Sequence, residues 1–217
     1  MTILLKDVQN FLGLRIIGLP VVGKCNSDGW RERMEEFLGR PLPPEKAGEH
    51  SNGVKLSWLR DQFGTCPENA DDDTVNYHCR AWVLHLFGCV LFPDATGDIA
   101  SWMFLPCLTS WQTAGGYSWA SAVLGFLYRQ LCEGSRRTSK NPTIGGCVYL
   151  LQLWMWSYLP VGRPTAQDRP AWFEMVGLRL RPTYADHWLG AQSTTPRKNA
   201  YIKYTDELDK LTPEMVS

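Results

Sequence analysis

Two histidines and a cysteine lie at helical spacing, and imidazole and thiolate groups are common ligands of zinc. His78 and His85 are seven residues apart, and Cys89 follows four residues later, so one helix could present all three side chains. The surrounding stretch is mostly apolar, and a buried helix with hydrogen-bonded histidines explains the same pattern without a metal. We therefore expect no metal here, and we assign Cys79 and Cys89 to the core as small residues.

Acidic residues offer a second candidate for chemistry. Asp94 and Asp98 could join one of the aspartates at 71–73 in a carboxylate cluster for two-metal phosphoryl transfer. The aspartates at 71–73 precede a predicted helix, however, where they favour the positive end of its dipole. Asp94 and Asp98 lie in the stretch FPDATGD, which ends one element and caps the next. We expect cap and loop roles and assign no catalytic residue.

The usual nucleophile and phosphate-binding motifs are missing from the chain. There is no G-x-S-x-G elbow, P-loop or dinucleotide fingerprint. The stretch AGGYS at 114–118 lacks the lysine and the preceding strand that a phosphate loop needs. The lysines stand in polar or terminal stretches, so none is a candidate for a pyridoxal Schiff base. We expect no enzymatic activity and no cofactor.

One basic cluster, formed by Arg136, Arg137 and Lys140, lies between two predicted core helices. These side chains could contact a phosphate backbone or an acidic partner, although a solvated loop is the default explanation. Lys plus Arg and Asp plus Glu both total 22, so no overall field draws the chain toward nucleic acid or acidic lipid. A nucleic-acid role would depend on this local patch.

Cysteine usage and hydropathy restrict the compartment. The seven cysteines are an odd number without a C-x-x-C pair, which argues against a disulfide framework and favours a reducing compartment, cytosol or nucleus. The apolar stretch before Lys6 is too short for a signal peptide. The uncharged run 99–128 is interrupted by Pro106 and by the glycines at 115–116, so we expect buried segments and no membrane span.

Apolar periodicity predicts a mainly α fold: one globular multi-helix domain with a short β-hairpin or extended pieces near the N-terminus. The hairpin is expected at 15–23 and an extended piece at 54–56. Loop-rich segments are expected at 40–53 and 162–200. The expected helices cover 7–12, 30–38 (capped by Ser27 or Asp28), 57–63 (capped by Ser57), 74–90, 97–111 (interrupted near Pro106), 117–134, 147–159 and 204–211.

Two of these helices carry specific expectations. On the helix over 74–90, one apolar stripe is predicted to face the core, and it consists of Val75, Cys79, Trp82, Val83, Leu86 and Val90. The segment 147–159 is too short for a bilayer and contains polar residues, so we expect a central core helix. Trp154 and Trp156 point about 200° apart on a helix, so they cannot form one stacking platform.

Ordered sequence blocks resemble the plant mobile domain, the family of the plant proteins called Maintenance of Meristems, also labelled aminotransferase-like. The blocks cover nearly the whole chain and include LLKDVQNFLGLRIIGLPVVG, VKLSWLRDQF, YHCRAWVLHLFGCVLFPDATGDIASWMFLPCL, YSWASAVLGFLYRQLCEGS, IGGCVYLLQLWMWSYLPVGRP and YTDELDKLTPEMV. Family members usually extend beyond both outer blocks. We therefore expect 1–217 to be a mobile domain truncated at both ends.

The resemblance implies a nuclear protein that acts in transposon silencing, genome integrity and meristem maintenance, with the cytoplasm as the alternative location. It implies protein partners, namely a long-form type-7 serine/threonine phosphatase or another mobile-domain protein. The metal motifs of such phosphatases are absent, since GDIAS at 97–101 is not one. The leading hypothesis is thus a non-enzymatic protein-interaction domain without a membrane role.

Two other hypotheses stay open. A transposon-derived protein could bind nucleic acid through Arg136, Arg137 and Lys140, or process it with a metal at Asp94 and Asp98; its binding would depend steeply on salt. A metabolic enzyme of the aminotransferase type would carry a coloured pyridoxal cofactor, and a colourless protein would exclude it.

Overall fold

The computed structural model describes residues 2–22, 26–45, 51–138, 143–168, 173–175, 178–180, 183–190 and 196–216. The chain groups into two compact units. We call Ile17–Val148 the central unit; the terminal unit combines Met1–Ile16 with Tyr149–Ser217. Two expectations, on Cys25 and Lys140, lie outside the described residues.

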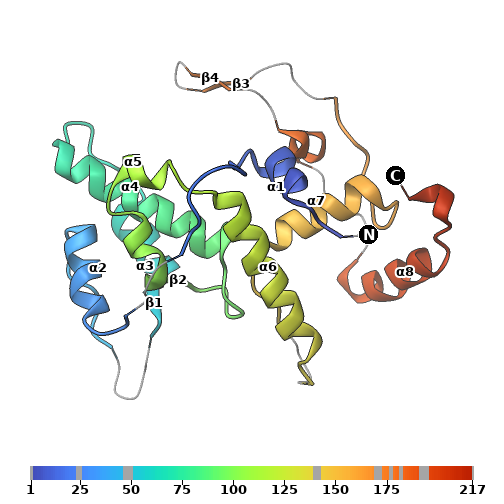
Figure 1. Ribbon diagram of the computed structural model, residues 1–217, viewed down its shortest axis with the longest axis horizontal. Coiled ribbons are helices and arrows are strands. Elements are labelled where there is room, and N and C mark those ends of the chain that lie inside the picture. Colours follow the sequence, from blue (N-terminus) through green and yellow to red (C-terminus); the bar gives the residue numbers. More distant parts are fainter. Residues whose placement is uncertain are drawn as a thin grey trace. The chain divides into compact units, whose positions relative to one another are not determined.

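Helices dominate both units, which confirms the mainly α fold expected from the sequence (Figure 1). The elements of the central unit are α2 (Trp30–Leu38), β1 (Gly53–Lys55), α3 (Leu56–Phe63), α4 (Asp72–Leu86), the π-helix η1 (Phe87–Leu91), β2 (Ile99–Ser101), the 3₁₀ helix η2 (Trp102–Cys107), α5 (Trp111–Ala114) and α6 (Trp119–Ser135). The elements of the terminal unit are α1 (Leu5–Leu12), α7 (Val148–Tyr158), β3 (Phe173–Met175), β4 (Leu178–Leu180), the 3₁₀ helices η3 (Tyr184–Trp188) and η4 (Pro213–Met215), and α8 (Arg197–Asp209).

Helix ends follow local chemistry, with two corrections. Asp71 caps α4 by accepting the Thr74 amide N–H at 2.8 Å, and the hydrogen bonds to Thr74 hold the pKa of Asp71 below its usual value. The caps predicted for α2 and α3 are wrong, because Gly29 and Lys55 precede those helices and neither offers a side-chain acceptor. At its other end α2 stops at Gly39, whose φ of 64° suits a residue without a Cβ.

Within the described residues of the central unit, the strands form one antiparallel pair, in which Val54 of β1 lies opposite Ala100 of β2. Residues 99–101 are therefore a strand, and the helix predicted over 97–111 begins only at Trp102. The hairpin predicted at 15–23 does not form in the described residues 15–22. Leu19 instead makes a single parallel bridge to Tyr117, and the chain bends at residues 16–18.

The face that α4 turns to the core differs from the predicted stripe. Ala81 and Leu84 are buried, whereas Val75, Cys79 and Trp82 are exposed. The helix has apolar side chains on two faces, so their periodicity alone does not identify the buried face. At Gly88, just beyond α4, an added Cβ would lie 2.6 Å from Leu56 Cδ2 and 2.9 Å from the Ile99 carbonyl oxygen, so the backbone approaches its neighbours closely there.

An aromatic cluster fills the core of the central unit. Phe92 stacks on Phe104 with ring centroids 4.2 Å apart. Phe87 meets Phe92 edge-on, with ring centroids 5.1 Å apart, and lies tilted against Trp119, with centroids 4.9 Å apart. Phe126 meets Phe92 edge-on at 5.7 Å between centroids. These contacts join η1, η2 and α6, whose residues lie far apart in sequence, into one packed layer.

In the terminal unit, α7 is a core helix on part of its surface, as the sequence indicated. Trp154 and Trp156 are buried, and Trp156 contacts Trp188 of η3 at 5.7 Å between centroids. By contrast, Tyr149 is 54% exposed. The segment expected to be loop-rich contains an antiparallel pair, β3 with β4, and α8 begins earlier than predicted, at Arg197.

One buried polar link crosses the terminal unit. The Tyr158 hydroxyl donates to Asp7 Oδ1 at 2.8 Å, and Asp7 Oδ2 accepts the Leu4 amide N–H at 2.8 Å. Asp7 is only 2% exposed. This carboxylate therefore both caps α1 and ties it to the end of α7. Among the residues that the structure describes, none forms a helix long and apolar enough to cross a bilayer.

Candidate functional site

The basic cluster expected from the sequence is described only in part. Arg136 and Arg137 follow α6 and are exposed. Arg137 Nη1 donates to the Thr143 carbonyl oxygen at 2.5 Å, so this side chain closes the end of the loop. Lys140 lies outside the described residues, and the contribution of the cluster to binding stays a prediction.

The histidine and cysteine trio on α4 and η1 does not assemble. His78 Nδ1 lies 3.1 Å from the Phe63 carbonyl oxygen, so its N–H donates there, whereas His85 Nδ1 lies 3.5 Å from Cys89 Sγ. Burial raises the pKa of the Cys89 thiol, which disfavours the thiolate that a metal requires. Within the described ranges, no three His, Cys, Asp or Glu side chains converge as metal ligands.

Asp94 and Asp98 lie in a loop and both contact the hydroxyl group of Thr96. The Thr96 hydroxyl oxygen lies 2.7 Å from Asp94 Oδ2 and 2.5 Å from Asp98 Oδ1, and Asp94 Oδ1 accepts the Gly97 amide N–H at 2.7 Å. These contacts agree with the predicted loop role. The predicted cap role is wrong, because β2 follows the loop and Ser101 caps η2.

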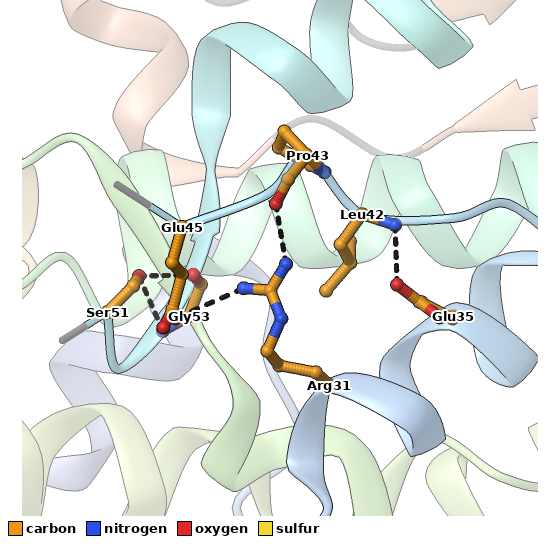
Figure 2. Close-up of polar contacts among 7 residues, drawn as sticks. All are labelled: Arg31, Glu35, Leu42, Pro43, Glu45, Ser51 and Gly53. Carbon is orange, nitrogen blue, oxygen red and sulfur yellow. Dashed lines mark hydrogen bonds and ion pairs between the residues drawn. The ribbon is translucent and has the colours of Figure 1, made fainter. Parts of the chain in front are cut away.

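A network of polar contacts fixes one side of α2 (Figure 2). Arg31 donates to Glu45 Oε1 at 3.1 Å and to the Pro43 carbonyl oxygen at 2.5 Å. Glu35, one turn further along α2, accepts the Leu42 amide N–H at 2.8 Å. Since Arg31 and Glu35 are four residues apart, they share one face of α2. This face of α2 therefore binds the segment 40–45 through hydrogen bonds. The other faces of α2 are turned toward different neighbours.

A pocket of about 590 Å³ lies where other residues of α2 face α4 and η2. We call it the arginine pocket. Trp30, Arg33 and Phe37 line it at helical spacing from α2, and Tyr77 and Arg80 line it from α4. The remaining lining residues are Asn26, Glu36, Trp102, Leu105, Pro106 and Thr109. Aromatic walls with a few charged groups are typical of sites for small organic ligands.

The two guanidinium groups of the arginine pocket make hydrogen bonds only to neutral acceptors. Arg80 Nη1 donates to the Phe37 carbonyl oxygen at 3.1 Å, and its guanidinium carbon lies 4.7 Å from the centroid of the Phe37 ring. Arg33 donates to the carbonyl oxygens of Asn26 and Asp28 at 2.7 Å and 2.5 Å. Neither arginine has an ion pair with a carboxylate among the described residues.

A second concave surface, of about 610 Å³, lies on the exposed face of α4, and we call it the tryptophan groove. Trp82 is 66% exposed there, and Trp111 and Val75 are 42% and 41% exposed. Trp111 Nε1 donates to Asn76 Oδ1 at 3.0 Å, which holds its indole against α4. The other lining residues are Phe63, Gly64, Cys66, His78, Cys79 and Val83. Exposed apolar surface of this kind commonly marks an interaction site.

The sequence did not reveal either surface. Four of the nine residues that line the tryptophan groove were assigned to the core by the apolar stripe, namely Val75, Cys79, Trp82 and Val83. The arginine pocket combines residues between 26 and 109 from several elements, and no local sequence pattern brings them together.

Comparisons with known proteins cover the whole chain. A family model described as the plant mobile domain matches residues 1–217. Protein MAIN-LIKE 1 of Arabidopsis thaliana is 37% identical over 221 residues, which span 100% of this chain and 40% of that protein. Protein MAINTENANCE OF MERISTEMS of the same plant is 35% identical over 218 residues, 100% of this chain and 42% of that protein.

A phosphatase-related protein is also similar. The serine/threonine-protein phosphatase 7 long form homolog of Arabidopsis thaliana is 42% identical over 164 residues, 75% of this chain and 12% of that protein. The chain thus spans less than half the length of these relatives. No solved structure matches it significantly.

Proposed function

Because the chain belongs to the plant mobile domain family, we propose that it is a non-enzymatic nuclear domain that binds protein partners in transposon silencing, genome integrity and meristem maintenance. The name of the relative MAINTENANCE OF MERISTEMS supports the last of these processes. The proposed partner is a long-form type-7 serine/threonine phosphatase or a second mobile-domain protein. Similarity to the phosphatase 7 long form homolog supports this choice.

The observation that carries the proposal is the exposure of Trp82 in the tryptophan groove. Tryptophan side chains dominate the binding energy of many protein interfaces, and each indole buries about 150–250 Å². At roughly 25 cal/mol per Å², covering the exposed two-thirds of Trp82 contributes about 2–4 kcal/mol before the entropic cost of association. A partner that covers Trp111 and Val75 as well would gain further apolar burial.

Charge supports a protein partner over nucleic acid. Equal numbers of basic and acidic residues leave no net field, whereas binding to a phosphate backbone needs several uncompensated cations. The groove is lined by apolar side chains and thiols and by one histidine, without an arginine or lysine.

The test compares two exposed aromatic residues. The tagged chain, its Trp82→Ala variant and its Tyr201→Ala variant are purified from plant nuclei with and without nuclease. Tyr201 is 81% exposed on α8 and outside the groove, so it is the matched control. Purified candidate partners are then titrated directly. We expect Trp82→Ala to weaken direct binding at least tenfold, with folding unchanged by circular dichroism and with Tyr201→Ala behaving as wild type.

Two outcomes would reject the protein-binding proposal. One is direct partner binding that Trp82→Ala leaves intact. The other is recovery of proteins only when nucleic acid is intact, which would favour the nucleic-acid alternative. The exposure of Arg136 and Arg137 at the end of α6 favours that alternative, and it predicts binding to DNA or RNA that falls steeply with salt and weakens in an Arg136→Gln, Arg137→Gln variant.

A further inference from the structure

Arg80, which lines the arginine pocket, has one buried polar atom without a partner among the described residues. Arg80 Nε has no hydrogen-bond acceptor in the described part of the chain, although it is shielded from solvent. Such groups are rare in folded proteins because leaving a donor unsatisfied costs about 1–3 kcal/mol, more for a charged group. We propose that the pocket is a binding site for a small organic anion, with one carboxylate attached to a flat apolar body. This site is separate from the tryptophan groove, and the proposal does not depend on the protein-binding function.

The size and walls of the pocket suit such a ligand. Its volume of about 590 Å³ lies within the range of roughly 300–1,000 Å³ that small-molecule sites occupy. Trp30, Tyr77 and Trp102 supply aromatic surface from three different elements, and aromatic rings pack favourably against flat apolar groups. Leu105 and Pro106 extend the apolar wall. An inorganic ion would leave this surface uncovered.

The charges of the pocket favour a monoanion. Two arginines and one glutamate line it, so the lining carries a net charge of 2 − 1 = +1. Among the described residues, Arg33 and Arg80 contact carbonyl and ring groups and form no ion pair with a carboxylate. A carboxylate would accept charge-assisted hydrogen bonds from a guanidinium group.

Glu36 allows a test of whether the bound ligand is negatively charged. It is exposed, and it belongs to the same helix as Arg33. A negative side chain beside a bound anion weakens binding, so its neutral isostere should bind the ligand more tightly. Loss of Arg33 should act in the opposite direction. A pocket that holds only the apolar body of the ligand would respond to neither substitution.

The experiment titrates the full chain with 2-naphthoate while tryptophan fluorescence and isothermal calorimetry are recorded. The matched probes are 2-naphthylmethanol, which lacks the charge, and acetate and inorganic phosphate, which lack the flat body. We expect 2-naphthoate to bind and the other three probes to bind at least tenfold more weakly. Removing a charge-assisted hydrogen bond should weaken 2-naphthoate binding by about tenfold to a hundredfold in Arg33→Gln and Arg80→Met.

Matched variants separate charge from folding. Glu36→Gln should tighten binding by about twofold to tenfold, and Arg129→Gln, which removes an exposed arginine of α6 outside the pocket, should change nothing. Arg80 also packs on Phe37, so the Arg80→Met protein could misfold. In that case the affinities of Arg33→Gln and Glu36→Gln test the proposal.

Specific results would overturn the proposal. Equal binding of 2-naphthylmethanol, or unchanged affinity in both Arg33→Gln and Glu36→Gln, would show an apolar pocket without an anion site. Phosphate binding as tight as that of 2-naphthoate would reject the flat carboxylate. Tighter binding of the peptide acetyl-Trp-Asp-Trp-amide than of 2-naphthoate would assign the site to an acidic peptide.

Discussion

Replacing Tyr158 by phenylalanine should destabilise the terminal unit by removing one hydrogen bond. The hydroxyl of Tyr158 donates to Asp7 across 151 positions of sequence, at 2.8 Å, and Asp7 is 2% exposed. Without the hydroxyl, Asp7 Oδ1 loses this donor while Oδ2 keeps the Leu4 amide. Hydrogen bonds to charged groups contribute about 1.5–3 kcal/mol, so the free energy of unfolding should fall by about that amount.

The assay is urea unfolding followed by near-ultraviolet circular dichroism, with free energies extrapolated linearly to water. For a chain of this size the expected loss corresponds to a decrease in melting temperature of about 3–12 °C. Tyr201→Phe is the control, because Tyr201 is 81% exposed. A double-mutant cycle with Asp7→Ala isolates the pair, and contacting residues should show a coupling energy of about 0.5–3 kcal/mol. A Tyr158→Phe protein as stable as the control, with coupling near zero, would refute the reasoning.

Three further predictions concern titration, backbone conformation and thiol access. The hydrogen bond to Asp7, with burial, raises the pKa of Tyr158 from 10.0 to about 12. The native state thus favours the neutral phenol. This stabilisation is complete below pH 10 and should disappear as pH rises from about 10 to 12. In alkaline unfolding titrations, wild type should therefore lose stability more steeply over this range than Tyr158→Phe. Gly39→Ala should lower the free energy of unfolding by at least about 1–2 kcal/mol in urea titrations, because φ is 64° and the added Cβ would meet the Tyr77 ring; wild-type stability would contradict this. Iodoacetamide should modify the exposed thiols quickly and the buried ones only on unfolding, as counted by mass spectrometry; the exposed thiols are Cys66, Cys79 and Cys132, and the buried ones are Cys107 and Cys147. Early modification of a buried thiol would show that the core is wrongly assigned.

Local signals in the sequence predicted most helices but not their surroundings. Gly13 and Gly39 follow the last residues of α1 and α2, which end where they were expected to end. Both glycines are left-handed, a conformation that favours glycine, so the local sequence marks these helix ends. Asp71 likewise marks the start of α4. Strand β2 was missed because its pairing with β1 joins residues nearly fifty positions apart, and no local pattern encodes such a partner.

The candidate surfaces were harder to predict because burial depends on the neighbours of a helix. On α4, Val75 and Trp82 face solvent, whereas Ala81 and Leu84 face the core. Both faces carry apolar side chains, so the sequence pattern alone does not show which face the neighbouring elements cover. The partners of Arg80 could not be foreseen either, since Phe37 belongs to a different helix forty-three positions earlier.

The composition of the terminal unit has a consequence for synthesis on the ribosome. Its first helix, α1, is translated before the whole central unit, and the residues that complete the terminal unit are translated after it. Asp7 therefore leaves the ribosome long before Tyr158, whose hydroxyl donates the hydrogen bond to its carboxylate. Because domains generally fold as they emerge, the central unit can form first, while α1 waits as an isolated short helix of marginal stability. A ribosome that stops before residue 149 would release a folded central unit with an unprotected N-terminal segment, a substrate for quality-control proteases.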